Sequence, residues 1–155
     1  MYHYIQKLLL IFIGAAVIFF VFSLCLAGTP DNLGLNNQFL SPCPRTPNCV
    51  SSQEKNLQHS VLPITFEGSL KLAKERLNRV INSMRGSRIL KQDDLYWHVE
   101  FTTQILRYID DVEFYFDGSQ SLIHLRSASR KGYWDLGVNR RRVETIRAKF
   151  EELTN

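Results

Sequence analysis

The feature that most constrains this chain is an uncharged run, LLLIFIGAAVIFFVFSLCLA, at positions 8–27. As a helix with a rise of ~1.5 Å per residue, it measures ~30 Å, the thickness of the hydrocarbon core of a bilayer. A buried core helix is a poor alternative, because it would be apolar on every side in a small protein. The run predicts a transmembrane anchor or, alternatively, a cleaved signal peptide with the small residues Cys25 and Ala27 before Gly28.

The charges that flank this run predict its orientation. Lys7 directly precedes it, whereas the first cation after it is Arg45. Because positively charged flanks stay in the cytoplasm, we expect a cytoplasmic N-terminus, with residues 28–155 across the membrane. The expected protein is therefore a single-pass inner-membrane protein with a periplasmic or otherwise extracytoplasmic folded part. The signal-peptide alternative leads to the same compartment.

Residues 28–63 contain all five prolines of the chain and show no sustained periodicity. This composition predicts an extended arm between the membrane segment, 1–27, and a folded domain, 64–155. In the arm, Cys43 and Cys49 lie six positions apart, a spacing that matches neither zinc sites nor thioredoxin-like sites. We expect a small disulfide ring in an oxidising compartment, with two free thiols as the alternative. We expect no metal and no cofactor.

The folded domain has the pattern of a helix, several strands and a second helix. Apolar residues recur at helical spacing from Leu70 to Met84, after the natural N-cap Ser69 and before Gly86. Period-two alternation then predicts strands at 88–91, 95–102, 111–117 and 122–127, and helical spacing returns from about Asn139. Each helix has one apolar stripe and each strand one apolar face. We therefore predict a two-layer α+β domain, α-β-β-β-β-α, with three or four antiparallel strands and both helices on one side.

Cations concentrate in the segment RSASRKGYWDLGVNRRRVE, residues 126–144. If Asn139 caps the last helix, Arg140, Arg141 and Arg142 occupy its first turn. The helix dipole disfavours each cation there by ~0.3–1 kcal/mol. Guanidinium groups beside free helical N–H groups suit a phosphate, sulfate or carboxylate. The pattern therefore predicts an anion-binding site at the three arginines.

Internal ion pairs are the alternative explanation for part of this charge. Asp110, Asp111 and Asp135 are the candidate partners of Arg126 and Arg130. We predict that Asp135 and one of the two adjacent aspartates pair with these arginines and fix the loop. Since neighbouring residues on a strand point to opposite faces, Asp110 and Asp111 are not expected to share one acid/base site.

Other candidate site residues give weaker signals. Ser127 and Ser129 lack the strand-to-helix elbow and the accompanying His and carboxylate of a catalytic nucleophile. His98 and His124 lie singly on separate predicted strands, without a third metal ligand. Turn hydrogen bonding better explains the two serines, and the two histidines indicate no metal site.

Three segments resemble the signature segments of the DUF1499 family, a domain of unknown function in bacteria and plastids: CPRTPNCVSS (43–52), DDVEF (110–114) and the basic segment 126–144. The resemblance spans residues 38–153, and Lys131 stands where an apolar or small residue is expected. It implies one compact domain to which these segments belong together. It supplies no activity, cofactor or mechanism.

Three classes of function fit a basic patch: a binding or scaffold module, an enzyme and a nucleic-acid binder. The expected topology excludes nucleic acid, because the patch lies outside the cytoplasm. We expect a non-enzymatic, membrane-anchored module whose partner is an anionic lipid, an envelope polymer or a protein. The alternative is a hydrolase-type envelope enzyme that uses the Arg/Asp loop on an anionic substrate.

Overall fold

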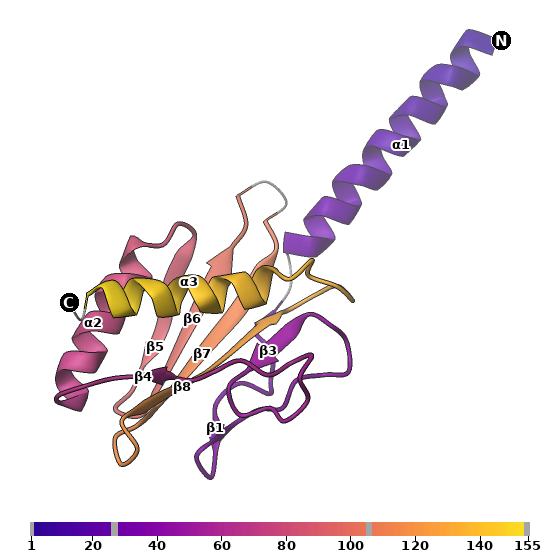
Figure 1. Ribbon diagram of the computed structural model, residues 1–155. Helices are drawn as coiled ribbons and strands as arrows, with labels where there is room; N and C mark the ends of the chain where they lie inside the picture. Colours follow the sequence, from indigo (N-terminus) through magenta and orange to yellow (C-terminus); the bar gives the residue numbers. More distant parts are fainter. Residues whose placement is uncertain (1, 26–27, 105–106, 154–155) are drawn as a thin grey trace.

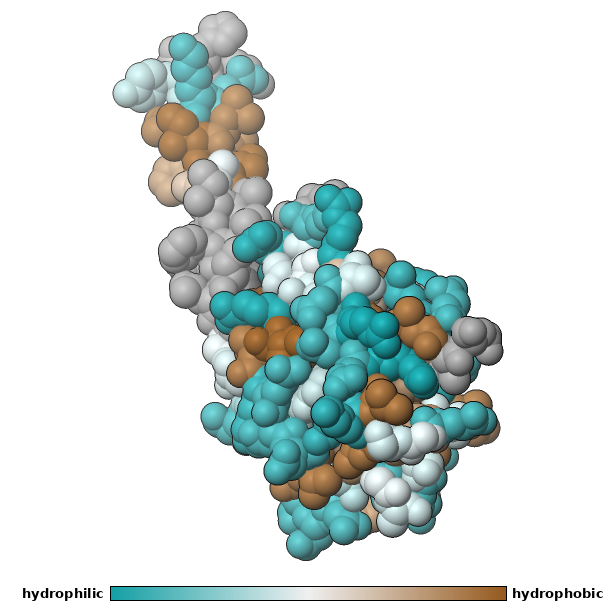
Figure 2. All heavy atoms as spheres, turned by 90° about the vertical axis from the view of Figure 1, so that its left-hand side faces the viewer, coloured by the Kyte–Doolittle hydropathy of each residue, from teal (hydrophilic) through white to brown (hydrophobic). Residues whose placement is uncertain are grey.

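The computed structural model describes residues 2–25, 28–104 and 107–153. Its first element, α1 (Tyr2–Cys25), extends away from the folded domain (Figure 1). Figure 2 shows the described side chains of α1 as a hydrophobic band next to a hydrophilic end. Within the described part of the chain, no helix combines the length and apolar character needed to cross a membrane. The predicted segment 8–27 lies partly outside that description, so the anchor stays a prediction.

The domain is built on an antiparallel meander. Its strands are β5 (Ser87–Gln92), β6 (Tyr96–Thr102), β7 (Ile109–Asp117) and β8 (Leu122–Ser129), each paired with the next. These are the four strands that period-two alternation predicts. Two short strands, β3 (Cys49–Ser51) and β4 (Ile64–Thr65), pair with β8. The strand order is β3-β8-β7-β6-β5, and β4 pairs with the start of β8 whereas β3 pairs with its end.

Two helices, α2 (Leu70–Ser83) and α3 (Val138–Glu152), cover one face of this sheet (Figure 1). Ser69 caps α2 as predicted, because its hydroxyl accepts a hydrogen bond from the Leu72 N–H. Alternate strand residues meet the helices in a single hydrophobic core, represented by Leu77, Phe114 and Ile146. The two-layer α+β architecture is therefore confirmed for this part of the chain.

The opposite face of the sheet is also covered, which the sequence did not predict. A hairpin of β1 (Leu35–Asn36) and β2 (Phe39–Leu40) lies over it, and Leu40 packs against Tyr96 and Tyr115. The sheet therefore presents two buried faces, one apolar and one rich in polar and charged side chains.

The predicted arm, residues 28–63, differs from the structure. Its second half forms β3 at the sheet edge, and Val50 and Val61 belong to the main core. The physical reason is that β8 would otherwise expose a row of unpaired backbone groups, which the segment after Cys49 pairs. The boundary at residue 64 therefore falls within the folded domain.

The start of α3 also differs from the prediction. The N-cap is Gly137, with a left-handed φ of 76°, and Asn139 lies inside the helix. Asp135 provides the side-chain cap, because its carboxylate accepts the N–H groups of Gly137 and Asn139 at 2.8 Å each. A loop carboxylate can satisfy these free N–H groups and the positive end of the helix dipole together.

Candidate functional site

The three segments quoted above from the sequence converge on one end of the sheet. β3, β8 and β7 are neighbours, so Cys49 and Asp111 both lie opposite Ala128. Asp110 and Asp111 point to opposite faces of β7, since they bind different arginines on the two sides. The candidate site therefore has two halves, separated by the sheet itself.

On the face away from the helices, Asp111 holds Arg130 and His98. Arg130 donates from Nε and Nη2 to the two Asp111 oxygens at 2.8 and 2.7 Å, and His98 Nε2 lies 2.7 Å from Oδ1. Burial favours the neutral acid, but the hydrogen bonds from Arg130 and His98 outweigh it and lower the pKa of Asp111. Asp111 is one of the acids predicted to fix the loop. Arg130 also donates to Glu100, which the sequence reading missed.

Arg126, on the same face, binds an acid that was not among its predicted partners. Its Nη1 donates to Glu113 Oε2 at 2.8 Å, and both side chains are almost completely buried. Glu113 also accepts hydrogen bonds from the Tyr96 hydroxyl and the Gly34 N–H, each at 2.8 Å. The signal that identifies this pair is strand register, which places Glu113 directly opposite Arg126.

On the helix face, Asp110 accepts a hydrogen bond from Arg142 Nη2. Arg142 Nη1 donates to Asn139 Oδ1 at 2.7 Å, and its guanidinium lies 4.9 Å from the centre of the Phe101 ring. Asn139 is fully buried and links α3 to β8 and to the loop before β3, since it also donates to Asn48 O and to Ser129 Oγ. The sequence assigned Arg142 to an exposed triple, whereas it is half of a buried ion pair.

The three consecutive arginines do not form one site. Successive helical residues point about 100° apart. Arg140 donates to the backbone carbonyls of Ser60 and Gln58, and Arg141 donates to the carbonyl of Leu136. The three arginines therefore have different hydrogen-bond partners, and anion binding by them stays a prediction.

Asp135 makes no ion pair with an arginine among the residues that the structure describes; it caps α3 instead. The proposed pairing of Asp135 with Arg126 or Arg130 is therefore replaced by the Glu113 and Asp111 contacts. The error follows from the assumption that Asn139 is the cap, which left the carboxylate of Asp135 available for another role.

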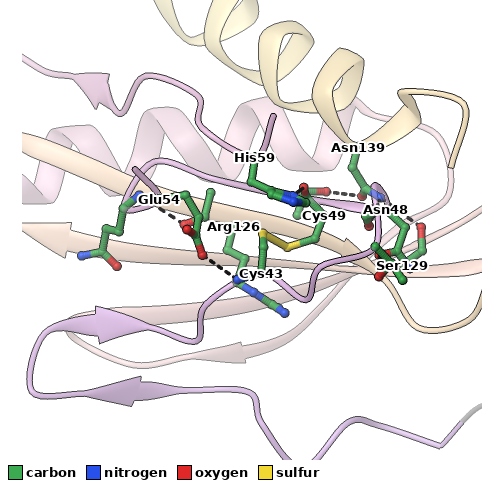
Figure 3. The surroundings of a disulfide bond; sticks show 12 residues. Cys43, Asn48, Cys49, Glu54, His59, Arg126, Ser129 and Asn139 are labelled. Atoms are coloured by element: carbon green, nitrogen blue, oxygen red, sulfur yellow. Dashed lines mark hydrogen bonds between the residues drawn. A yellow bond between two sulfur atoms is a disulfide. The ribbon is translucent and has the colours of Figure 1, made fainter. Parts of the chain in front are cut away.

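The disulfide between Cys43 and Cys49 is confirmed. Figure 3 shows it beside the Arg126 side chain. Cys43 N–H donates to Glu54 Oε1 at 2.7 Å, and the Cys49 carbonyl lies 2.8 Å from His59 Nδ1. These contacts tie both ends of the disulfide ring to the following loop.

A groove of about 810 Å³ opens on the helix side, between the end of α2 and the start of α3. Four cations line it, Arg85, Arg141, Arg142 and Lys149, and none of its described lining residues is acidic. Met84, Phe101 and Val138 supply apolar surface, and Thr102, Thr103 and Thr145 supply hydroxyl groups. Two of the three predicted anion-binding arginines therefore meet two cations that the sequence reading did not select.

The residues considered for chemistry have structural partners. Ser127 Oγ donates to Asn139 Oδ1 at 2.6 Å, and Ser129 Oγ accepts from Asn139 Nδ2 at 2.9 Å. His124 stacks on Tyr115 and lies 3.2 Å from Ser52 Oγ. Across the described residues, no group of three His, Cys, Asp or Glu side chains is arranged to hold a metal ion.

Comparison with known proteins gives one match. The family model described as protein of unknown function (DUF1499) matches residues 39–150. No curated protein and no solved structure matches the chain. The matched range begins within the hairpin that covers the charged face and ends in α3, so it includes both halves of the candidate site.

Proposed function

Because the chain belongs to the DUF1499 family, whose function is unknown, we propose a function from its own residues: it is a membrane-anchored, extracytoplasmic domain that binds an anionic group in the basic groove. This is a binding module, and its anchor is the apolar segment 8–27. The partner carries phosphate, sulfate or carboxylate groups, as an anionic lipid, an envelope polymer or an acidic protein does.

Two observations support the location. Residues 8–13 of α1 are all apolar and exposed, consistent with an environment other than water around this helix. The Cys43–Cys49 disulfide is typical of proteins in oxidising compartments. Together with Lys7 before the apolar segment, they favour an N-terminus in the cytoplasm and a domain outside it.

The groove is the observation that carries the binding proposal. Within it, Arg142 is held by Asp110, Asn139 and Phe101, so its position is fixed before a ligand arrives. Arg141 is exposed and Lys149 half-buried, so their charged groups are available for an anion. Arg142 is paired with Asp110, so Arg85, Arg141 and Lys149 supply the positive potential that attracts anionic partners to the groove.

The experiment measures binding of the full-length chain in zwitterionic nanodiscs to dextran sulfate, and to vesicles that contain phosphatidylglycerol. The test variant is Arg141→Gln/Lys149→Gln. The matched control is Lys71→Gln/Arg79→Gln, which removes the same charge from exposed positions of α2 outside the groove. We expect the groove variant to bind about tenfold more weakly, because two charge contacts are lost.

The control variant should bind nearly as well as the wild type, and the wild-type affinity should fall as salt is added. Binding to dextran sulfate alone indicates a polymer, and binding to the vesicles alone indicates a lipid. Equal losses in the two double variants would mean that net charge, and not the groove, governs binding. No observation in the described residues favours the alternative, an envelope hydrolase.

A further inference from the structure

Three large apolar side chains lie exposed close together in the loop between β8 and α3. Tyr133, Trp134 and Leu136 are 73%, 65% and 62% exposed. Elsewhere in the described part of the folded domain, exposed large apolar side chains occur singly along the sequence. Single exposed apolar residues need no explanation, whereas a cluster marks a surface that binds a partner or a membrane. We call residues 131–136 the aromatic loop.

The aromatic loop adjoins the basic groove. A hollow lined by Trp134 and Leu136 shares three of its residues with the groove, Thr103, Tyr108 and Val138. Arg141, one of the groove cations, donates from Nη1 to the Leu136 carbonyl at 2.9 Å. The acid within the loop, Asp135, is occupied as the cap of α3. The loop and the groove therefore form one continuous surface of aromatic and cationic side chains.

Chain length brings the proposed anchor to the same end of the sheet. Pro30 lines one small cavity together with Ser129 and Arg130, the two residues that directly precede the aromatic loop. Three positions separate residue 27 from Pro30, so the end of the anchor lies within ~11 Å of Pro30. Figure 1 shows α1 leaving the domain at this end of the sheet, where α3 begins. The aromatic loop is therefore on the side of the domain nearest to the proposed anchor.

The chemistry of this surface fits a bilayer. Tryptophan and tyrosine are enriched where membrane proteins meet the lipid headgroups, because their rings have an apolar body and a polar tip. Cations beside them attract anionic lipids, and Arg85 and Arg141 are exposed at the groove. A protein partner could also cover aromatic side chains. The tether favours the bilayer, because it keeps the lipid surface within reach at all times.

We propose that the aromatic loop docks on the bilayer that holds the anchor. Tyr133, Trp134 and Leu136 enter the interfacial layer, and the groove opens toward the lipid headgroups. This inference rests on the proposed membrane anchor. It also identifies the anionic group of the groove as the headgroup of an anionic phospholipid. The domain is then held against the membrane in one orientation, with the turn before β6 facing away from it.

The test uses the two tryptophans of the chain, Trp97 and Trp134, as reporters. The full-length chain is placed in nanodiscs of phosphatidylcholine and phosphatidylglycerol, with or without bromine on the lipid acyl chains, which quenches a tryptophan that contacts them. Trp97 is buried in the core and serves as the unquenched reference. Trp134→Phe removes the reporter in the loop. The matched control, Trp134→Phe/Leu95→Trp, moves an exposed tryptophan to the turn before β6, at the opposite end of the sheet.

We expect brominated discs to lower the emission of the wild type and to leave both variants unchanged. Discs of phosphatidylcholine alone should give less quenching, because the cations lose their anionic headgroups. Equal quenching in the two kinds of disc would overturn the assignment of an anionic lipid to the groove.

Docking is overturned if the wild type elutes with the discs but is not quenched, or if the control variant is quenched equally. Emission that depends on the number of chains per disc, without quenching, would assign the loop to a second copy instead. A chain that does not elute with the discs would overturn the anchor and this inference together. The dextran sulfate measurement tests the groove without lipid, so it can succeed where docking fails.

Discussion

At the scale of single residues, the two adjacent aspartates of β7 explain how the basic segment is tolerated. Asp110 binds Arg142 on the helix face, and Asp111 binds Arg130 on the other. Glu113, two residues further along, binds Arg126. Three arginines of the basic segment are therefore neutralised by three acids of one strand, and alternation along that strand decides on which face each acid meets its arginine.

Asp111→Asn tests the most heavily bonded of these acids. The amide keeps the shape but loses the charge, which leaves the buried Arg130 with Glu100 as its remaining acid among the pairs described. Breaking a buried pair from one side costs about 3 kcal/mol. Urea unfolding should show this loss, while Asp94→Asn, an exposed change of the same kind, should show almost none. Equal stability of the two variants would contradict the assigned role of Asp111.

His124 gives a prediction about acid. Burial lowers the pKa of His124 below its ordinary value of 6.5, and nearby Asp117 only partly opposes this. A depressed folded-state pKa means that the stabilisation is present above the unfolded-state value and is lost as pH falls through the folded-state value. The free energy of unfolding should therefore decrease as the pH falls below about 6.5, and the decrease should be smaller in His124→Phe. An unchanged slope in that variant would exclude His124 as the cause.

At the scale of elements, periodicity predicts what depends on one segment alone. The spacing of apolar residues places α2 and the four strands of the meander correctly, and Ser69 marks the start of α2. Periodicity does not reveal which distant segment completes an edge or a cap. The pairing of Cys49 with Ala128 joins positions far apart in the chain. At the start of α3, Asp135 accepts the N–H of Asn139 and provides the cap that the sequence assigned to Asn139.

The same limit explains why the contacts within the candidate site were not predicted. Alternation separates Asp110 from Asp111, but only the register of β7 with β8 places Glu113 opposite Arg126. Arg85, which follows α2, meets Arg141 only through tertiary packing, whereas Lys149 shares one face of α3 with Arg141 at helical spacing. The sequence therefore identified charged residues of the site, but not which residues they bind.

Removal of the disulfide tests whether the segment that contains β3 is part of the folded domain. Because β3 is part of the sheet, Cys43→Ser/Cys49→Ser should lower the free energy of unfolding by about 2 kcal/mol, the loop-entropy value for so small a ring. Urea unfolding with and without reductant measures it: reductant should destabilise the wild type and leave the double variant unchanged. A negligible loss would support the original picture of an arm outside the domain.

At the scale of the whole molecule, the chain has two buried sheet faces and an apolar helix at its N-terminal end. The helix face supports the groove, which is lined by Arg85, Arg141, Lys149 and the paired Arg142, and the other face carries the buried ion pairs of Asp111 and Glu113. The proposed anchor keeps the groove attached to the membrane surface. Attachment raises the effective concentration of any partner that resides there.

The location of the domain is the central claim, and one topology measurement tests it most directly. A reporter that is active only outside the cytoplasm is fused after Asn155, and membranes are washed with carbonate. Since Lys7 lies before the apolar segment and no cation follows until Arg45, we predict an active reporter that remains in the membrane fraction. The account would be contradicted if this fusion were inactive and a second reporter, active only in the cytoplasm, gave a signal at the same position. Release of a shortened, soluble chain would mean that the apolar segment is a cleaved signal and not an anchor.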